Sequence, residues 1–373
     1  MALSASVDRQ AQIRPLDRRN NPAMLEILRQ SPIETGGLSI CFDRQPDIFA
    51  MADLKYAPAI WRGFFEGDTL AGFGMVGYHS AYVNGSVTPV MHITDCYIRP
   101  GSRGRGYLKS ALGYFSDEGA GRAQIGYAVV MKGNRAAEAQ IGDRFAETPC
   151  GLKSRIIGDL VARSIVLAYP RRASTNLKVR RARLDDIPDV VGLLQAEHQQ
   201  RLFGLVTDCD VFAAQLAQRS GLSIDDYYVA ERAGKLEGVC AAWDTSAFKQ
   251  NRVVRYGFGL SLVRAASIAT ARIGGLPTLP RPGEAFRDVF LTDWAVRDRS
   301  EEVMHALIEH IYREYRDRRY HTLIFGSCAQ DLLLRAARRF PGTDLVSHIA
   351  LISLDVNGLE YDARLPFIDL ALL

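Results

Sequence analysis

Thr94-Asp-Cys-Tyr-Ile-Arg-Pro-Gly-Ser-Arg-Gly-Arg-Gly-Tyr-Leu-Lys-Ser-Ala-Leu112 is the stretch around which the rest of the chain is organised. The apolar and β-branched run from Ile93 to Ile98 predicts a strand, and apolar residues from Tyr107 onward recur at helical spacing. Pro100-Gly101 ends the strand, because proline has no N–H to donate and glycine tolerates a sharp bend. The stretch is therefore a strand, a turn and a helix.

The turn itself reads Arg103-Gly104-Arg105-Gly106. Its glycines let the backbone turn tightly at the start of a helix, so that successive N–H groups point outward and bind an anion together with the helix dipole. Arg103, Arg105 and Lys109 add positive charge, which favours a seat for a pyrophosphate. The alternative is a solvated basic loop that only caps the helix. The glycine spacing matches neither a P-loop nor a dinucleotide-binding turn.

At these residues the chain resembles the GNAT acyltransferase superfamily. Its signature is Val-x-Pro, followed by Arg/Gln-x-x-Gly-x-Gly/Ala at the start of a helix. Here the signature reads Ile98-Arg99-Pro100 and Arg103-Gly104-Arg105-Gly106-Tyr107-Leu108, with Leu108 where the family has a small residue. The resemblance implies that Arg103 to Lys109 bind the pyrophosphate of an acyl-coenzyme A. It also implies that the preceding strand, with Cys96 and Ile98, lines the pantetheine arm.

Composition narrows the class of protein. A chain of 373 residues suits two domains, and 47% hydrophobic with 24% charged residues is typical of a soluble globular protein. The net charge of +4 is mild, so we expect no nucleic-acid or membrane role. Six scattered cysteines without Cys-x-x-Cys predict no zinc site and no disulfide scaffold, and fit a reducing cytoplasm. Residues 1–12 lack the apolar core of a signal peptide. Phe258 to Leu276 comes nearest to a membrane span, but Arg264 and Arg272 interrupt it.

The first half of the chain reads as strands around the opening stretch. Asn84-Gly85 is the strongest hairpin signal in the sequence. The variable segment 36–53 has no clear assignment. The elements that we expect are a strand at 13–17 before a helix, a hairpin over 61–78 with its turn at 66–68, a strand over 88–98, a strand over 123–131, a helix from 133, and two strands or one bent pair over 155–169.

The second half repeats the first in the same order. The best match sets Leu291-Thr-Asp-Trp-Ala-Val-Arg297 against Ile93-Thr-Asp-Cys-Tyr-Ile-Arg99. The further matches are 179–188 with 13–17, 231–238 with 66–72, 320–325 with 123–131, and 336–340 with 141–145. We therefore predict a duplication, with units at 1–172 and 177–373. The resemblance implies an α/β fold in which each unit is a mixed, mostly antiparallel sheet flanked by helices.

The two copies differ where the ligand of the first is expected. After Val296 the second copy has no Gly-x-Gly turn, and Glu301 and Glu302 stand at the helix start, where they compete with a phosphate for the N–H groups. The second copy should therefore not bind coenzyme A in the same way. It also carries an insert over 255–285, with a helix expected over 260–273. The insert either reaches over the cleft of the first unit or covers only its own sheet.

Acyl transfer from a thioester to an amine needs a base for the amine and a donor for the carbonyl oxygen. Asp95 is the base that we favour, and Tyr97 shares its face of the strand by period-two alternation. His92 is the second choice and should face the other way. Asp293 occupies the place of Asp95 in the second copy, so a structural carboxylate is the alternative for Asp95.

The acid for the leaving thiolate departs from the family pattern, which is Asn-x-x-Ala-x-x-x-Tyr. The chain has Asn134 and Ala137 at the first two places but Ile141 in place of the tyrosine. Three alternatives remain: Tyr97, Tyr107 or Tyr127 protonates the leaving thiolate, or the thiolate leaves with the help of water, or the protein binds coenzyme A without fast acyl transfer. By resemblance Asn134 contacts the pantetheine arm, and it can also cap its helix. Cys96 is better explained as a packed cysteine than as an acyl carrier.

These observations predict an acyl-CoA-dependent N-acyltransferase of the GNAT type in the cytoplasm. It would use acetyl-CoA or another acyl-CoA, and no metal. Its acceptor would be a primary amine of a small molecule or peptide, and the second unit would shape the acceptor site or hold a homodimer. The rival hypotheses are a non-catalytic acyl-CoA sensor or scaffold, and a transferase of an aminoacyl group or a longer acyl chain.

Overall fold

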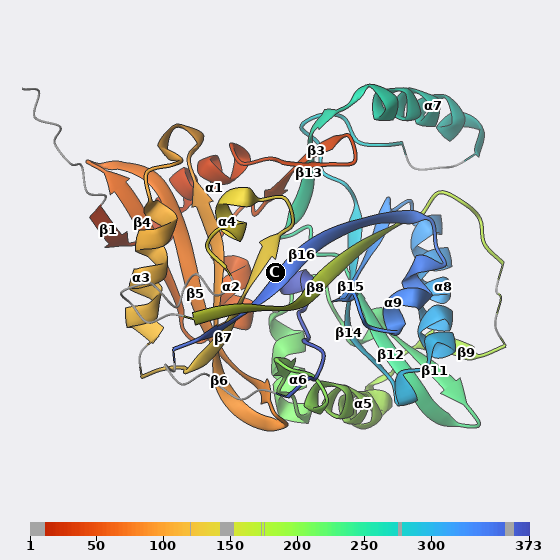
Figure 1. Ribbon diagram of the computed structural model, residues 1–373. Helices are drawn as coiled ribbons and strands as arrows, with labels where there is room; N and C mark the ends of the chain where they lie inside the picture. Colours follow the sequence, from red (N-terminus) through yellow and green to blue (C-terminus); the bar gives the residue numbers. More distant parts are fainter. Residues whose placement is uncertain are drawn as a thin grey trace, which may run out of the picture.

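The computed structural model describes residues 12–119, 121–141, 153–172, 174, 176–274, 278–354 and 362–373. One sheet of 13 strands crosses the molecule (Figure 1). Helices pack on both of its faces through clusters of buried apolar side chains. In the first half, α1 packs on one face of the sheet and α3 on the other. In the second half, α5 and α8 lie on opposite faces of β12.

The elements of the first half of the chain follow in order. They are β1 (Gln12–Pro15), α1 (Asn21–Arg29), β2 (Ile33–Thr35), β3 (Leu38–Asp43), α2 (Ala50–Lys55), β4 (Ala59–Glu66), β5 (Thr69–Val83), β6 (Ser86–Ile98), α3 (Tyr107–Gly119), β7 (Ile125–Met131), α4 (Arg135–Glu138) and β8 (Lys153–Val166).

The second half repeats this order with additions. Its elements are β9 (Lys178–Arg181), α5 (Ile187–Gln199), β10 (Gly204–Leu205), α6 (Cys209–Gln218), β11 (Tyr227–Arg232), β12 (Lys235–Trp243), β13 (Gln250–Tyr256), α7 (Phe258–Gly274), β14 (Asp288–Val296), α8 (Glu301–Asp317), β15 (Thr322–Cys328), α9 (Leu333–Arg338) and β16 (Gly342–Ser353).

The large sheet is mixed and mostly antiparallel, as predicted. Its strand order is β1-β4-β5-β6-β7-β16-β8-β15-β14-β12-β11-β9, with β10 paired to β5. Among the strand pairs that the structure describes, β6–β7 and β14–β15 are parallel. These two pairs occupy corresponding places in the two halves. Each half of the chain therefore contributes one parallel pair of strands to the sheet, at the same place in its order.

The two halves exchange their last strands. Strand β16, from the end of the chain, pairs with β7 and β8, and β8 pairs on its other side with β15. The expectation of two strands or a bent pair over 155–169 was wrong: β8 is one long strand, Lys153–Val166. The strand contains a bulge at Ile157: Ile349 of β16 pairs with Gly158 and Ala350 with Ile156, so Ile157 is the extra residue of β8.

The predicted hairpins are confirmed. Asn84 and Gly85 have φ of 52° and 80° in the turn between β5 and β6, the geometry that favours Asn-Gly in a two-residue hairpin loop. The β11–β12 turn likewise has positive φ at Ala233 and Gly234. The predicted region 123–131 is β7, and the helix expected from 133 is the short α4.

The insert of the second half contacts the first half. Strand β13 pairs antiparallel with β3, and β3 pairs with β2, which makes a separate three-stranded sheet. The variable segment 36–53 thus contains the turn after β2, the whole of β3 and the first residues of α2. Helix α7 follows β13 and projects from the body of the molecule (Figure 1).

Candidate functional site

The parallel strands β6 and β7 separate after a short paired stretch. Val90 to Ile93 pairs with Ile125 to Ala128, and no described pairing with β7 continues beyond Ile93. The segment Thr94–Ile98 remains bound to β5 on its other side. Its edge toward β7 is therefore open to a ligand that carries amide groups, because backbone N–H and C=O groups need partners.

Asp95 lies in a β-bulge at the start of this open edge. Its φ is 52°, and the register of β5 against β6 skips between Phe73 and Met75. Asp293 in β14 has φ of 42° beside a register shift of β12. The repeat detected in the sequence thus extends to the same backbone irregularity, which redirects a side chain in each copy.

The bulge corrects the expectation for His92. A regular strand would place His92 and Asp95 on opposite faces, but one extra residue in the bulge brings them to the same face. The Nδ1 atom of His92 lies 2.5 Å from the Tyr56 hydroxyl, while Asp95 points toward Arg44 on the same side of the sheet. Burial lowers the pKa of His92 well below its ordinary value, so this histidine is neutral.

The turn at Arg103 to Gly106, which we expected to bind an anion, has the backbone conformation predicted for its glycines. Gly104 and Gly106 have φ of 81° and 80°, a conformation that glycine adopts without strain. The N–H groups of Gly104, Arg105 and Gly106 donate to no acceptor in the described parts of the protein. The first bond of α3 in this region runs from the Ser110 N–H to the Gly106 carbonyl, at 3.2 Å. The N–H groups before α3 are thus available to an anion.

Two side chains of the turn are bound to Glu66. The Tyr107 hydroxyl donates to Glu66 at 2.5 Å, and Arg105 forms an ion pair with it at 2.8 Å. The hydrogen bond from Tyr107 holds the pKa of Glu66 below its usual value. Tyr107 also stacks on Phe64. It therefore fixes the start of α3 and is not placed as the missing acid.

The remaining predicted contacts of the turn are arranged around it. Arg103 donates from Nε to the Ile98 carbonyl at 3.3 Å, which joins the turn to the open strand. Lys109 is exposed, and Leu108 packs against the apolar cluster under α3. The Cys96 thiol lies on the α3 side of the sheet, beside Gly74.

Asp95 faces a buried basic cluster that the sequence did not predict. Its carboxylate lies 3.6 Å from Arg44, and its side chain is 7% exposed. Lys55 and Lys249 belong to the same cluster: burial lowers the pKa of Lys55 to about 8 and that of Lys249 well below its ordinary value. No motif marked these residues, because Arg44 and Lys55 lie in the variable segment and near it, and Lys249 lies in the other half.

The last residues of the chain pass through this cluster. Lys249 donates to the main-chain oxygens of Leu370 and Leu373, the latter at 2.9 Å. Lys55 donates to Leu372 at 3.2 Å, and Arg44 donates to Leu373 at 3.1 Å. Segments from both halves and the end of the chain therefore meet beside Asp95. Figure 1 shows the C label near the middle of the molecule.

The tyrosines weighed as substitute acids have different surroundings. Tyr97 packs on Phe73 with ring centroids 5.6 Å apart, on the face of Asp95 as predicted. Burial raises its pKa, so the phenol keeps its proton. Tyr127 stacks on His92 with centroids 4.2 Å apart in the core. Tyr97 is thus the tyrosine nearest to Asp95 along the open strand.

Asn134 and Ile141 lie on either side of the short helix α4. The Asn134 side chain accepts from the Ala137 N–H at 3.3 Å and caps the helix. Ile141 packs against the apolar cluster beneath α3. The rest of the repeat segment 141–145, from residue 142 onward, lies outside the described residues.

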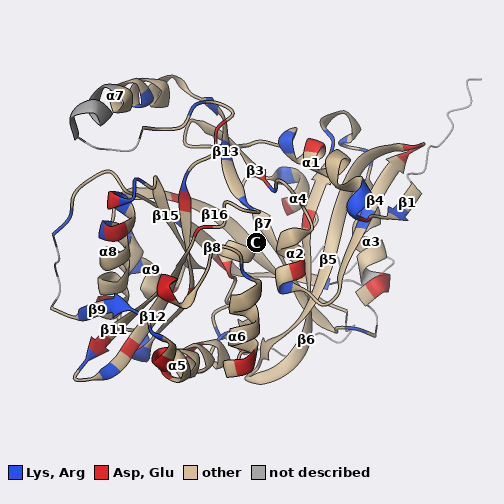
Figure 2. Ribbon diagram, turned by 180° about the vertical axis from the view of Figure 1, so that it is seen from behind, with Lys and Arg blue, Asp and Glu red and all other residues tan. Residues whose placement is uncertain are grey.

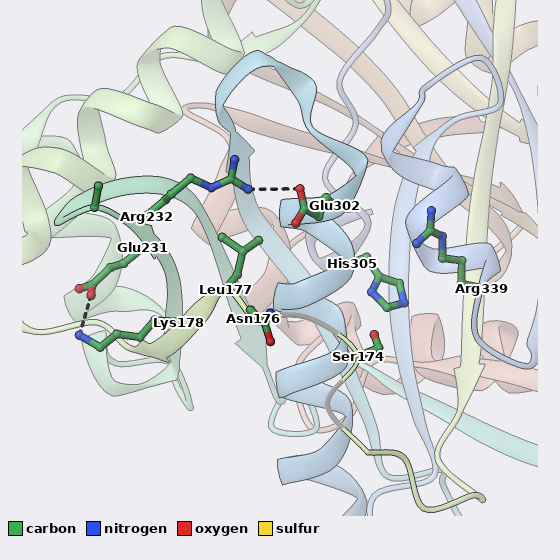
Figure 3. A pocket seen from close by; sticks show the side chains of 10 residues that line it. Ser174, Asn176, Leu177, Lys178, Glu231, Arg232, Glu302, His305 and Arg339 are labelled. Carbon is green, nitrogen blue, oxygen red and sulfur yellow. Dashed lines mark hydrogen bonds and ion pairs between the residues drawn. The ribbon is translucent and has the colours of Figure 1, made fainter.

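The start of α8 in the second copy is occupied by its own side chains. Ser300 caps the helix, Glu301 pairs with Arg339 at 2.7 Å, and Glu302 pairs with Arg232 at 3.2 Å. Figure 3 shows the cavity of about 540 Å³ that Arg232, Glu302 and Arg339 help to line. Its lysine and one of its arginines are paired with carboxylates, Lys178 with Glu231 and Arg232 with Glu302.

A metal site has no support in the described residues. Within them, no group of three or more His, Cys, Asp or Glu side chains is placed to hold a metal ion. Charges of both signs are spread over both halves (Figure 2).

This chain resembles known proteins in its structure, whereas the sequence comparisons found no match. No family model matches the sequence, and no curated protein matches it. Among solved structures, a GCN5-related N-acetyltransferase from Sphaerobacter thermophilus has a TM-score of 0.55 at 11% identity, over 97% of this chain and 98% of the other. A tandem GNAT protein from the clavulanic acid biosynthesis pathway has a TM-score of 0.51 at 12% identity, over 92% and 99%.

This chain has a tandem GNAT fold. Saccharomyces cerevisiae N-myristoyltransferase with bound myristoyl-CoA has the same arrangement at a TM-score of 0.60 and 11% identity, over 95% of this chain and 80% of the other. The GNAT resemblance inferred from Ile98 to Leu108 is therefore confirmed for the fold. Because the sequence identities are only 11–12%, the roles of individual residues in these structures cannot be transferred to this chain.

Proposed function

We propose that the protein is an acyl-CoA-dependent N-acyltransferase, with the acyl-CoA bound by the first unit (1–172) and an acceptor that carries a primary amine. In the simplest case the acyl group is acetyl. The observation that carries the proposal is a pair of adjacent features: the unused N–H groups at Gly104 to Gly106 and the open edge of Thr94–Ile98. A pyrophosphate fits the first and a chain of amides fits the second.

Recognition of the cosubstrate follows from these two features. The N–H groups before α3 and the side chains of Arg103 and Lys109 receive the pyrophosphate. The pantetheine arm adds along Thr94–Ile98 as a further strand would, beside Cys96 and near Asn134. The thioester then lies at the bulge, where the strand edge first opens.

The reaction forms a C–N bond and breaks a C–S bond. The neutral amine attacks the thioester carbonyl through its nitrogen lone pair, and Asp95 takes a proton from that nitrogen as the C–N bond forms. A strand N–H beside the bulge donates to the carbonyl oxygen as negative charge develops there. The C–S bond then breaks, and Tyr97 gives its hydroxyl proton to the thiolate.

The buried basic cluster lies beside Asp95, the proposed base. Arg44 lies 3.6 Å from the carboxylate of Asp95, and Lys55 and Lys249 belong to the same buried cluster. Lys249 belongs to the second unit (177–373) and donates to the main-chain oxygen of Leu373, so the second unit supports the proposed catalytic centre. The role of the second unit is thus structural support of the site, without a pyrophosphate seat of its own.

Turnover and binding test the proposal together. Free thiol released from acetyl-, succinyl- and long-chain acyl-CoA is measured across a panel of amines, with Asp95→Asn as control. Release that depends on both the amine and Asp95 supports the proposal. Failure of every acyl-CoA to bind contradicts it.

A second candidate is a non-catalytic acyl-CoA sensor. It is favoured by Ile141, an apolar side chain packed at the place where the family pattern has a tyrosine. A sensor binds acyl-CoA with the same Gly106 dependence but releases no thiol with any amine. A transferase of longer chains is distinguished by a larger thermal shift with long-chain than with acetyl-CoA.

A further inference from the structure

Helix α7 turns its apolar side away from the protein. Phe258 is 84% exposed, Leu262 58% and Val263 52%. Ile268 follows at 41%. A surface helix of a globular protein normally faces its core with such residues. Large apolar side chains gathered on one exposed element mark an interaction surface.

The opposite side of α7 contacts the rest of the insert through polar groups. Arg264 donates from Nε to the Pro280 carbonyl at 3.2 Å. Ser267 accepts from the Leu279 N–H at 3.4 Å. Leu260, Arg264 and Ser267 follow at i, i+4 and i+7, so they share one face, while Phe258 and Leu262 lie on the other. The helix is therefore held by its polar face, with its apolar face outward.

The charge of the insert has one dominant sign. Residues 250–287 contain six arginines and one acidic residue, Glu284, and the helix Phe258–Gly274 contains no acidic residue. Two of the arginines are paired with acids of the first half: Arg252 with Asp43 and Arg255 with Glu34. The remaining excess is positive. Figure 2 shows blue and no red on the part of α7 that is described.

The place of α7 suits a flat partner. The helix lies along one edge of the molecule, and no described element covers its outer side (Figure 1). A planar surface can reach the whole apolar face without contact with the sheet. A 17-residue helix with an apolar face, a cationic complement and no acid has the features of helices that lie in a membrane interface.

We propose that α7 docks the protein on an anionic lipid surface. Phe258 and Leu262 enter the boundary between headgroups and acyl chains, and the net positive charge of the insert favours an anionic surface. This proposal replaces the expectation of no membrane role, which rested on net charge over the whole chain and on the lack of a spanning run. Among the described helices, none has the length and apolar character needed to cross a bilayer, so α7 would lie in the plane of the surface.

The proposal is independent of acyl transfer, and vesicle flotation tests it with the full chain. The vesicles are phosphatidylcholine alone, or phosphatidylcholine with about one third phosphatidylglycerol. The variant Phe258→Ser/Leu262→Ser removes the apolar anchors. Leu184→Ser is the matched control, because Leu184 is 69% exposed on a different part of the surface.

We expect the wild type to float with the anionic vesicles and not with the neutral ones. The double variant should bind at least ~10-fold more weakly, because each side chain contributes a large part of its transfer free energy. Leu184→Ser should bind as the wild type does, and 0.5 M salt should weaken binding.

Two results would overturn the proposal. One is the absence of flotation with both kinds of vesicle, or equal flotation with both. The other is a stable dimer in sedimentation velocity that Phe258→Ser/Leu262→Ser abolishes, because a second copy would then cover the face. Circular dichroism at the same concentrations confirms that each variant is folded.

Discussion

Replacement of Gly106 by glutamate tests the anion-binding turn directly. Gly106 has φ of 80°, and a Cβ at this position would meet no atom within 4 Å. The substitution therefore causes no steric clash in the folded protein. Its two effects are a backbone cost, since L-residues rarely adopt this conformation, and a carboxylate placed beside the N–H groups that would bind the pyrophosphate.

The magnitude follows from the groups involved. Each hydrogen bond to a charged group contributes about 1.5–3 kcal/mol, and at least two N–H groups of the turn would be lost to the ligand or shared with the new carboxylate. A loss of about 3–4 kcal/mol raises the Kd by about 100- to 1,000-fold. The backbone cost of about 1–2 kcal/mol lowers the free energy of unfolding without unfolding the protein.

Isothermal titration calorimetry with coenzyme A and acetyl-CoA measures the change. Gly36→Glu is the matched control: Gly36 has φ of 53° and open space around it, so the variant carries the same backbone cost and the same charge in the β2–β3 turn. We expect weak or unmeasurable binding for Gly106→Glu and wild-type binding for Gly36→Glu. Equal Kd values for wild type and Gly106→Glu would refute the reasoning.

Four further predictions concern the base, the acid, acid stability and the basic cluster. Asp95→Asn should lower kcat by about 100-fold or more with little change in the KM for acyl-CoA, whereas Asp293→Asn, which also deprives an arginine of its carboxylate, should lower stability but not kcat. Tyr97→Phe should lower kcat by about 10- to 100-fold and leave coenzyme A binding unchanged; an unchanged kcat would assign the thiolate proton to water. Burial lowers the pKa of His79 to about 3, so below pH 6.5 the unfolded chain binds a proton that the folded protein refuses. The free energy of unfolding from urea titrations should therefore fall by up to about 1.4 kcal/mol per pH unit between pH 6.5 and 4 because of this residue, and His79→Leu should show a shallower fall. Lys249→Ala should lower stability by about 3 kcal/mol, because main-chain oxygens in the centre lose their donor, and a loss below about 1 kcal/mol would argue against that anchoring role.

Local chemistry made much of the fold predictable from the sequence. Asn84-Gly85 can hardly be read as anything other than a hairpin turn, and the structure has it with positive φ at both residues. The glycines at 104 and 106 predicted the turn before α3 because few residues adopt that backbone. The paired motifs at 93–99 and 291–297 revealed the duplication, which the matching bulges support.

Features that depend on distant parts of the chain were not predictable in this way. The bulge at Asp95 adds one residue to the strand, and this changes the face on which His92 lies. The pairing of β8 with β15 and β16 arises from contacts across about 180 residues, so no local pattern signals it. Arg44 and Lys249 meet only in the folded protein, where main-chain oxygens at the end of the chain bind both.

A crystal structure of the protein with coenzyme A tests the central claim most directly. The account predicts the pyrophosphate on the N–H groups of Gly104 to Gly106 and the pantetheine arm along Thr94–Ile98, with its thiol near Asp95. A pyrophosphate at the start of α8, beside Glu302, or a turn at Gly104 to Gly106 left empty at saturating coenzyme A, would contradict it.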